Sequence, residues 1–178
     1  LYSVDAKYMA EPSNGYIRVS KLAATTTEEF KLALSELGKQ GMKNLILDLR
    51  GNGGGYLNAA IDMANEFLPA NKLIVYTEGR AYPRQDAMSV GNGTMKERKI
   101  IILIDEGSAS ASEIVTGALQ DWDRALVIGR RSFGKGLVQR SFNLPDGSAM
   151  RLTVSRYYTP SGRSIQKSYE EGLEAYHN

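Results

Sequence analysis

One stretch sets the fold class of this chain, Lys43-Asn-Leu-Ile-Leu-Asp-Leu-Arg-Gly-Asn-Gly-Gly-Gly55. Its first seven residues form a short apolar run of the kind that is buried on both faces of a sheet. The glycines break this strand, and apolar residues then recur at helical spacing at Leu57, Ile61 and Leu68. A buried strand, a glycine turn and an amphipathic helix in this order indicate an α/β protein with layered sheets and helices.

Further elements are predicted upstream of this stretch and just after it. We expect a strand at residues 16–19, then a helix that begins with a capping box of Thr26 and Glu29 and stops at Gly41. The polar stretch of residues 79–97 predicts a long exposed loop.

Downstream, apolar or alternating runs predict short strands at residues 73–76, 99–104, 125–128, 136–144 and 148–158. The last two flank Pro145-Asp-Gly147 and predict a hairpin. Ile114 and Ala118 predict a helix between two of these strands. With no repeat or composition break, we expect residues 1–178 to form one domain.

Composition excludes several classes of function. The 22 basic and 20 acidic residues give a net charge of +2, so we expect no nucleic-acid partner. The chain has no cysteine, which excludes disulfides and thiolate metal sites. No apolar run approaches the roughly 20 residues that span a membrane. We therefore expect no membrane span, no metal and no cofactor, while the oligomeric state does not follow from the sequence.

Small residues surround a possible nucleophile in Gly107-Ser-Ala-Ser-Ala-Ser-Glu-Ile114. On local sequence alone, a serine at this helix start can serve as a nucleophile or as a cap. A hydroxyl needs a base, and the single histidine, His177, is next to last in the chain. Lysine is an attested alternative base. The candidate is Lys135, which two glycines flank in Phe133-Gly-Lys-Gly-Leu-Val-Gln139.

Together with two further motifs, these residues resemble the C-terminal processing (tail-specific) peptidases, serine endopeptidases with a Ser-Lys dyad. The further motifs are Leu47-Asp-Leu-Arg-Gly-Asn-Gly-Gly-Gly55 and Tyr157-Tyr-Thr-Pro-Ser-Gly-Arg-Ser-Ile-Gln166. The resemblance covers roughly residues 15–166 and is loose over residues 79–97. It implies a ClpP/crotonase-like layered α/β fold of repeated strand-strand-helix units.

The resemblance also implies roles for individual residues. It makes Ser110 the nucleophile and Lys135 the base, with Gln139 orienting the lysine amine, and it favours Gly55 and Ala111 as the donors of an oxyanion site. A helix start supplies unpaired N–H groups for such a site, which suits Ala111. From the residues alone, any of the three glycines that end the glycine stretch can supply the second donor: Gly53, Gly54 and Gly55.

A lysine base must lose its proton. Its reference pKa of about 10.4 falls by roughly 3 to 5 units only on burial in an apolar cleft. Phe133 and Leu137 lie near Lys135 in sequence and lead us to expect such a cleft. Gln139 can aim the amine without adding a charge, or it is an ordinary strand residue.

Three other patterns are read as structural. Gly129-Arg-Arg-Ser-Phe-Gly-Lys-Gly136 copies a P-loop except at its last position, where glycine replaces the magnesium-binding hydroxyl residue. We interpret Asp48 and Arg50 as an ion pair or strand end. Asp105 and Glu106 are adjacent, so as strand residues they point to opposite faces and are not a carboxylate pair.

The sequence thus predicts a serine endopeptidase domain that cuts protein or peptide substrates near their C-termini without a cofactor. A catalytically silent peptide-binding module of the same fold and a crotonase-type acyl-CoA enzyme remain as alternatives. In the resembled family a PDZ domain precedes the segment that starts near Tyr2-Ser-Val-Asp5, so we expect residues 1–178 to be an excised catalytic domain. The family implies a periplasmic or cell-envelope location.

Overall fold

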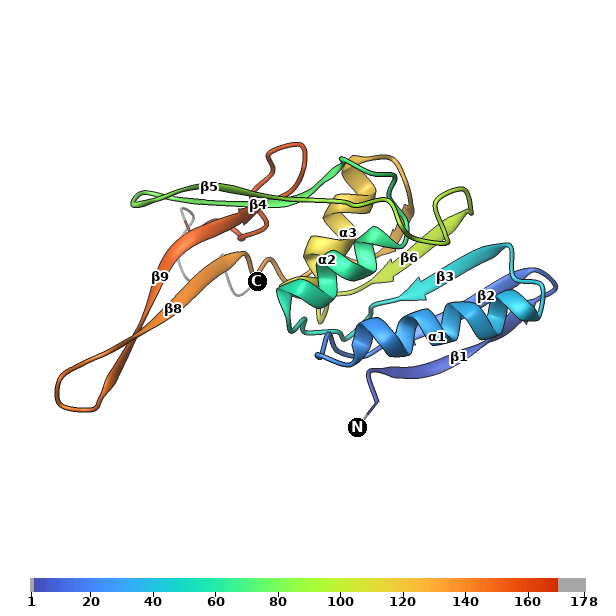
Figure 1. Ribbon diagram of the computed structural model, residues 1–178, viewed down its shortest axis with the longest axis horizontal. Helices are drawn as coiled ribbons and strands as arrows, with labels where there is room; N and C mark the ends of the chain where they lie inside the picture. The colour runs from blue at the N-terminus through green and yellow to red at the C-terminus, as the bar shows by residue number, and fades with distance from the viewer. Residues whose placement is uncertain (1, 170–178) are drawn as a thin grey trace.

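The computed structural model describes residues 2–169, which form two sheets and three helices (Figure 1). The helices are α1 (Thr26–Lys39), α2 (Leu57–Asn65) and α3 (Ala111–Asp121). The strands are β1 (Val4–Glu11), β2 (Asn14–Val19), β3 (Asn44–Asp48), β4 (Leu73–Gly79), β5 (Tyr82–Met88), β6 (Ile100–Ile104), β7 (Leu126–Gly129), β8 (Leu137–Asn143) and β9 (Ala149–Tyr158).

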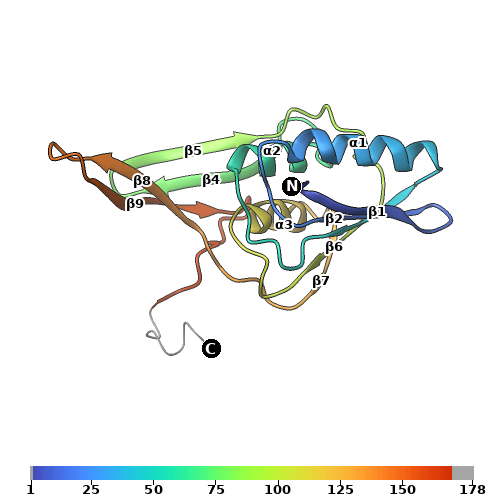
Figure 2. The ribbon, with the colours of Figure 1, turned by 90° about the horizontal axis from the view of Figure 1, so that it is seen from below.

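The main sheet has the strand order β1-β2-β3-β6-β7. Strands β2, β3, β6 and β7 are parallel, and only β1 runs antiparallel to its neighbour. Figure 2 shows α1 and α2 lying over this sheet. Because Asp48 pairs with Leu103, the carboxyl ends of β3 and β6 meet at one edge. The glycine loop and the serine run both start from that edge.

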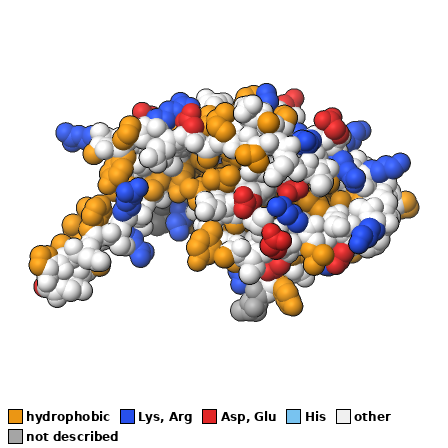
Figure 3. Space-filling model, in the orientation of Figure 1, with side chains coloured by type: hydrophobic (Ala, Val, Ile, Leu, Met, Phe, Trp, Pro, Cys, Tyr) orange, Lys and Arg blue, Asp and Glu red, His pale blue; other side chains and the backbone are white. Residues whose placement is uncertain are grey.

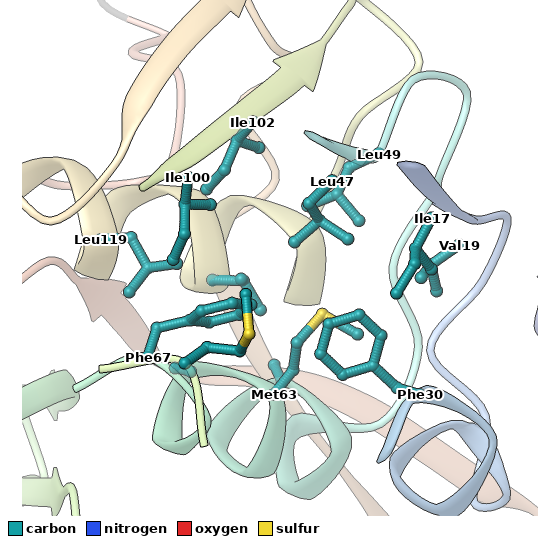
Figure 4. Close-up of a cluster of buried hydrophobic side chains, with 14 of the residues drawn as sticks. Ile17, Val19, Phe30, Leu47, Leu49, Met63, Phe67, Ile100, Ile102 and Leu119 are labelled. Atoms are coloured by element: carbon teal, nitrogen blue, oxygen red, sulfur yellow. The ribbon is translucent and has the colours of Figure 1, made fainter. Parts of the chain in front are cut away.

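A hydrophobic core fills the space between the main sheet and the helices (Figure 4). Leu47 and Ile102 from neighbouring strands face Met63 of α2, and Phe30 of α1 packs against Phe67 with ring centroids 6.0 Å apart. All five side chains are fully buried. Burial of each such side chain stabilises the fold by about 1.5–3 kcal/mol, which fixes the layers on which the site is built.

The second sheet has the order β5-β4-β9-β8 and projects from the body (Figure 1). Apolar side chains remain exposed along its β8–β9 hairpin, and Figure 3 shows this apolar surface; they are Phe142, Leu144, Met150 and Leu152. Strand β8 begins directly after the loop that carries Lys135, so this sheet is continuous with the candidate site.

The layered α/β class is confirmed, and most helices and strands lie where the sequence predicts them. The prediction of a loop over residues 79–97 was wrong for residues 82–88, because β5 pairs there with β4 as an antiparallel hairpin, and it is confirmed for residues 89–97, which form no helix or strand. Strand β5 is an edge strand with mostly exposed side chains and contains Pro83. An edge strand tolerates proline and needs little apolar alternation, so its sequence carries no strand signal.

The start of α1 also differs from the prediction. Its N-cap is Thr25 rather than Thr26, and the Thr26 hydroxyl accepts the Ala23 N–H instead. The Glu29 carboxylate accepts the backbone N–H groups of Ser3 and Val4. Glu29 therefore binds the start of β1 to helix α1. The sequence did not predict β1.

Two predictions need correction, one about burial and one about where a helix ends. Ile46 is only half-buried, so β3 is not apolar and buried along the whole of both faces. Helix α2 ends at Asn65, and Leu68 is buried beyond it. None of the helices in residues 2–169 has the length and hydropathy required to cross a bilayer.

Asp48 forms the structural ion pair predicted for it. The carboxylate is buried and accepts hydrogen bonds from Arg50 Nη2 at 2.7 Å and from the Tyr16 hydroxyl at 2.6 Å. Burial alone raises the pKa of Asp48, but the bonds from Arg50 and Tyr16 outweigh it and hold the pKa below its usual range. Burial and the neighbouring Asp48 raise the pKa of Tyr16 to about 12.

These shifts predict a specific alkaline behaviour. Tyr16 has a higher pKa in the folded chain, so its contribution to stability is complete below about pH 10 and is lost as the pH rises toward 12. Tyr16→Phe lacks the Asp48 bond and is less stable at neutral pH. We expect this stability difference to narrow between pH 10 and 12 in urea unfolding. A constant difference over that range contradicts the role of Tyr16.

Candidate functional site

Ser110 stands at the sharp turn between β6 and α3, directly before the first helical residue. Its backbone has φ 57° and ψ −117°, a conformation that residues other than glycine rarely adopt. Such strain concentrates at functional sites. A strained strand-to-helix turn is also the geometry that exposes the nucleophilic serine of α/β-hydrolases.

The two neighbouring serines have structural roles. Ser108 is 1% exposed, and its hydroxyl donates to the Leu49 carbonyl at 2.8 Å and accepts the Asp105 N–H at 3.0 Å. Ser112 is fully buried and donates to the Asn52 carbonyl at 3.0 Å. Ser110 is more exposed than either. Within the run, it is therefore the serine open to a substrate.

Glu113 joins the serine turn to the loop of residues 132–136, which we call the lysine loop. The side chain is 7% exposed, and its carboxylate accepts four hydrogen bonds. Oε2 accepts the N–H of Ser110 and of Lys135, each at 2.8 Å. Oε1 accepts the Ser132 hydroxyl at 2.7 Å and the Gly134 N–H at 2.6 Å.

The shared oxygen brings two predicted site residues together. The backbone nitrogens of Ser110 and Lys135 both lie 2.8 Å from Glu113 Oε2, so they are separated by no more than twice that distance. A lysine side chain has a flexible four-carbon stem. The Lys135 side chain therefore starts from a backbone that lies close to the Ser110 backbone.

A segment after β9 holds the other side of the lysine loop; we call residues 159–167 the strap. The Lys167 N–H donates to the Gly134 carbonyl at 2.9 Å. An added Cβ on Gly134 would lie 2.7 Å from Lys167 Cβ, and one on Gly136 would lie 2.4 Å from the Gln166 nitrogen. The two glycines flanking Lys135 are thus required for close packing against the strap.

The side chains of Lys135 and Gln139 are both exposed. Within residues 2–169, no hydrogen bond or ion pair joins either of them to Ser110. Phe133 is exposed as well, so the apolar cleft that we expected around Lys135 is not formed. The roles of Lys135 and Gln139 stay predictions, supported by the backbone position of Lys135.

The glycine loop, residues 51–55, packs against the serine turn. Asn52 is fully buried, and its backbone carbonyl accepts the Ala109 N–H at 2.9 Å while its side chain accepts the Gly54 N–H at 2.9 Å. A Cβ on Gly54 would lie 2.8 Å from both Ser110 Cβ and Ala111 N. Only glycine at this position lets the two loops approach.

The available backbone donors favour Gly55 over Gly54 at the oxyanion site. The Gly54 N–H is taken by Asn52. Gly55 forms a parallel bridge with Leu22 in which the bonds run through the Gly54 carbonyl and the Tyr56 N–H. Among the described residues, no acceptor takes the N–H of Gly55 or of Ala111. The N–H of Gly53 also has no acceptor among the described residues, so Gly53 stays a candidate for the second donor.

Sequence reasoning missed the positioning roles of Glu113, Asn52 and Gly54. For Glu113 a signal was present, since Ser110 and Glu113 have the spacing of a capping box and the carboxylate does accept the Ser110 N–H. Its bonds to the lysine loop had no sequence signal, because they span some 20 residues of chain.

No other chemistry emerges from the described residues. Gly136 leads into β8 rather than a helix, which confirms that residues 129–136 are not a P-loop. Asp105 accepts the Gly51 N–H, which with other hydrogen bonds lowers its pKa, and Glu106 pairs with Arg130. Residues 2–169 contain no cluster of three or more His, Cys, Asp or Glu side chains suited to a metal ion. A cavity of 340 Å³ is lined by Glu113 and other residues of α3, by the lysine loop and by the strap.

Known proteins match this chain in sequence and in fold. Residues 13–174 match peptidase family S41. A carboxyl-terminal-processing protease of a Synechocystis species is 44% identical over 87% of this chain and 36% of its own length. A probable CtpA-like serine protease of Staphylococcus aureus is 41% identical over 92% of this chain and 33% of its own. The chain thus spans about a third of these relatives.

Solved structures support the same assignment. The photosystem II D1 C-terminal processing protease superposes with a TM-score of 0.82 at 38% identity, over 89% of this chain and 41% of its own. The tricorn protease, at 19% identity and a TM-score of 0.53, covering 81% of this chain and 13% of its own, supports the fold alone.

Gly54→Ala tests the packing of the glycine loop against Ser110. The added methyl would lie 2.6 Å from the Ala109 carbonyl oxygen, at a residue with φ +94°. We expect a loss of about 1–3 kcal/mol in the free energy of unfolding, as for other forced overpacking. Gly53→Ala is the matched control, because nothing lies within 4 Å of its added Cβ. Equal losses in both variants would contradict the packing role of Gly54.

Glu113→Gln tests the buried carboxylate. One oxygen becomes an NH₂ group that cannot accept, so two of the four donors lose their partner. An unsatisfied buried donor costs about 1–3 kcal/mol, which predicts a drop of about 2–6 kcal/mol in urea unfolding. Glu106→Gln is the control, since Glu106 is exposed and pairs only with the exposed Arg130. A loss for Glu113→Gln no larger than for the control would show that the carboxylate does not hold the two loops.

Proposed function

The chain belongs to peptidase family S41, and on this premise we propose that it carries the catalytic site of a serine endopeptidase. Its substrates are proteins or peptides, cut near their carboxyl termini. The Synechocystis relative, which is named a carboxyl-terminal-processing protease, supports this substrate class, and the chain spans about a third of its length. The location that goes with this proposal is the periplasm or cell envelope, which fractionation of the source cells tests.

The reaction proceeds through an acyl-enzyme. Ser110 Oγ attacks the scissile carbonyl carbon while the neutral amine of Lys135 accepts the hydroxyl proton. The N–H groups of Gly55 and Ala111 stabilise the tetrahedral oxyanion. As the peptide bond breaks, Lys135 returns the proton to the leaving amine, and Gln139 orients the lysine. Water then attacks the acyl-enzyme, again with Lys135 as base.

One observation carries the proposal: Glu113 Oε2 accepts the N–H of both Ser110 and Lys135. Two segments 25 residues apart in sequence therefore meet at one buried atom. The strained backbone of Ser110 and the uncommitted N–H groups of Gly55 and Ala111 complete the support.

A catalytically silent peptide-binding module is the second candidate. This candidate is favoured by the exposure of the Lys135 and Gln139 side chains, neither of which forms a hydrogen bond to Ser110 within residues 2–169. A serine-reactive fluorophosphonate distinguishes the two, because an acyl-enzyme mechanism requires an activated serine. Mass spectrometry that locates the adduct on Ser110 supports the enzyme, whereas peptide binding with neither adduct nor turnover supports the module.

Replacement of each serine tests the nucleophile. We expect Ser110→Ala to abolish hydrolysis of an unfolded protein substrate, because no other hydroxyl is placed to attack. Ser108→Ala and Ser112→Ala remove buried hydrogen bonds and cost about 1–3 kcal/mol of stability, but they retain a substantial part of the activity. A folded Ser110→Ala protein with wild-type turnover would refute the assignment.

The charge of Lys135 gives a second test. Lys135→Arg should fold and be inactive, because a guanidinium keeps its proton at working pH. The wild-type rate should rise with pH as the amine deprotonates. Gln139→Glu should move this rise to higher pH, since a nearby carboxylate stabilises the protonated amine. Rates measured from pH 6 to 10 check both, and a shift toward acid would mean that Lys135 is not the base.

A further inference from the structure

The motif that ends at Gln166 has no role in the mechanism above, yet it packs against the lysine loop. The strap leaves β9 and turns back toward α3. At its turn, the Asp121 carboxylate accepts the Ser161 N–H at 2.9 Å and the Ser161 hydroxyl at 2.7 Å, and it pairs with Arg163. The first half of the strap is thereby fixed to the C-terminal end of α3.

The second half of the strap reaches the lysine loop through Gln166. This side chain is 8% exposed, and its Oε1 accepts the Gly136 N–H at 3.0 Å. Its Nε2 donates to the Lys167 carbonyl at 3.1 Å and lies 3.2 Å from the Tyr169 hydroxyl. One partner of the amide, the Gly136 N–H, is a donor, and the other, the Lys167 carbonyl, is an acceptor. The amide oxygen must therefore face Gly136 and the amide nitrogen must face Lys167.

Gln166 and Glu113 hold the two sides of Lys135. Glu113 binds the N–H groups of Gly134 and Lys135, and Gln166 binds the N–H of Gly136. The backbone of Lys135 is therefore fixed on both sides while its side chain is exposed. Because no hydrogen bond or ion pair within residues 2–169 holds the amine, the backbone determines where the side chain starts.

We propose that Gln166 is a positioning residue for the Lys135 base: its amide oxygen, through the Gly136 N–H, sets the backbone from which the lysine amine reaches Ser110. This inference rests on the proposed function. A displacement of about 1 Å in a catalytic group can lower a rate about a hundredfold, so loss of this one bond has a measurable effect on acylation.

The test compares three substitutions in the protein at its full natural length. Gln166→Met keeps the length of the side chain but cannot accept the Gly136 N–H strongly, and Gln166→Glu keeps an accepting oxygen. Gln120→Met is the matched control, because Gln120 Oε1 binds the strap through Arg163 at 3.0 Å but does not contact the lysine loop. The readout is the rate at which a fluorophosphonate phosphonylates Ser110, with loss of fluoride, from pH 6 to 10.

We expect Ser110 of the Gln166→Met variant to be phosphonylated about tenfold to a hundredfold more slowly and the rise with pH to be lost, because the amine no longer reaches Ser110. Gln166→Glu and Gln120→Met should keep the rise. Simple destabilisation lowers the amplitude but leaves the shape of the pH profile. A Gln166→Met profile with wild-type rate and shape overturns the proposal.

If the proposed function itself is wrong, the wild-type protein shows neither phosphonylation of Ser110 by the probe nor hydrolysis of a substrate. Amide hydrogen exchange decides the case if Gln166→Met does not fold. In folded wild-type protein, the Gly136 N–H should exchange slowly because it donates a hydrogen bond to Gln166 Oε1. Rapid exchange there overturns the proposal whether or not the variants fold.

Discussion

The carboxylate of Glu113 is the interaction on which the arrangement of the site depends. It is buried, and burial of a charge costs several kcal/mol unless hydrogen bonds replace its hydration. Four donors do so here. Because these donors belong to the serine turn and to the lysine loop, neither loop can move without leaving the charge unsatisfied. The free energy that keeps Glu113 buried therefore also keeps Ser110 beside Lys135.

The same bonds account for the backbone strain at Ser110. A non-glycine residue in its conformation costs about 1–3 kcal/mol. A hydrogen bond to a charged group contributes about 1.5–3 kcal/mol, and the Ser110 N–H donates one to Glu113. The packing of Gly54 against Ser110 Cβ restricts the turn from its other side. One bond and one close contact are thus enough to hold a strained turn that presents the hydroxyl.

The sequence predicted the parts of the fold that have strong periodicity. Residues 43–49 are apolar because β3 is central, whereas β1 and β5 are edge strands whose exposed side chains leave no pattern. The serine turn was predictable from its local composition. The contact between Glu113 and the lysine loop was not, because sequence spacing carries no distance between segments that only the tertiary fold brings together.

The two glycines around Lys135 have no side chains, and this lets the backbone of the strap pack closely against the lysine loop. In the proposed mechanism, the backbone and the side chain of Lys135 therefore have different roles. Hydrogen bonds from α3 and the strap fix the backbone of Lys135, while its exposed side chain retains torsional freedom. Under the proposed mechanism, assembly of a Ser110–Lys135 dyad requires rotation about side-chain bonds and exclusion of water by the bound substrate, and no rearrangement of the backbone.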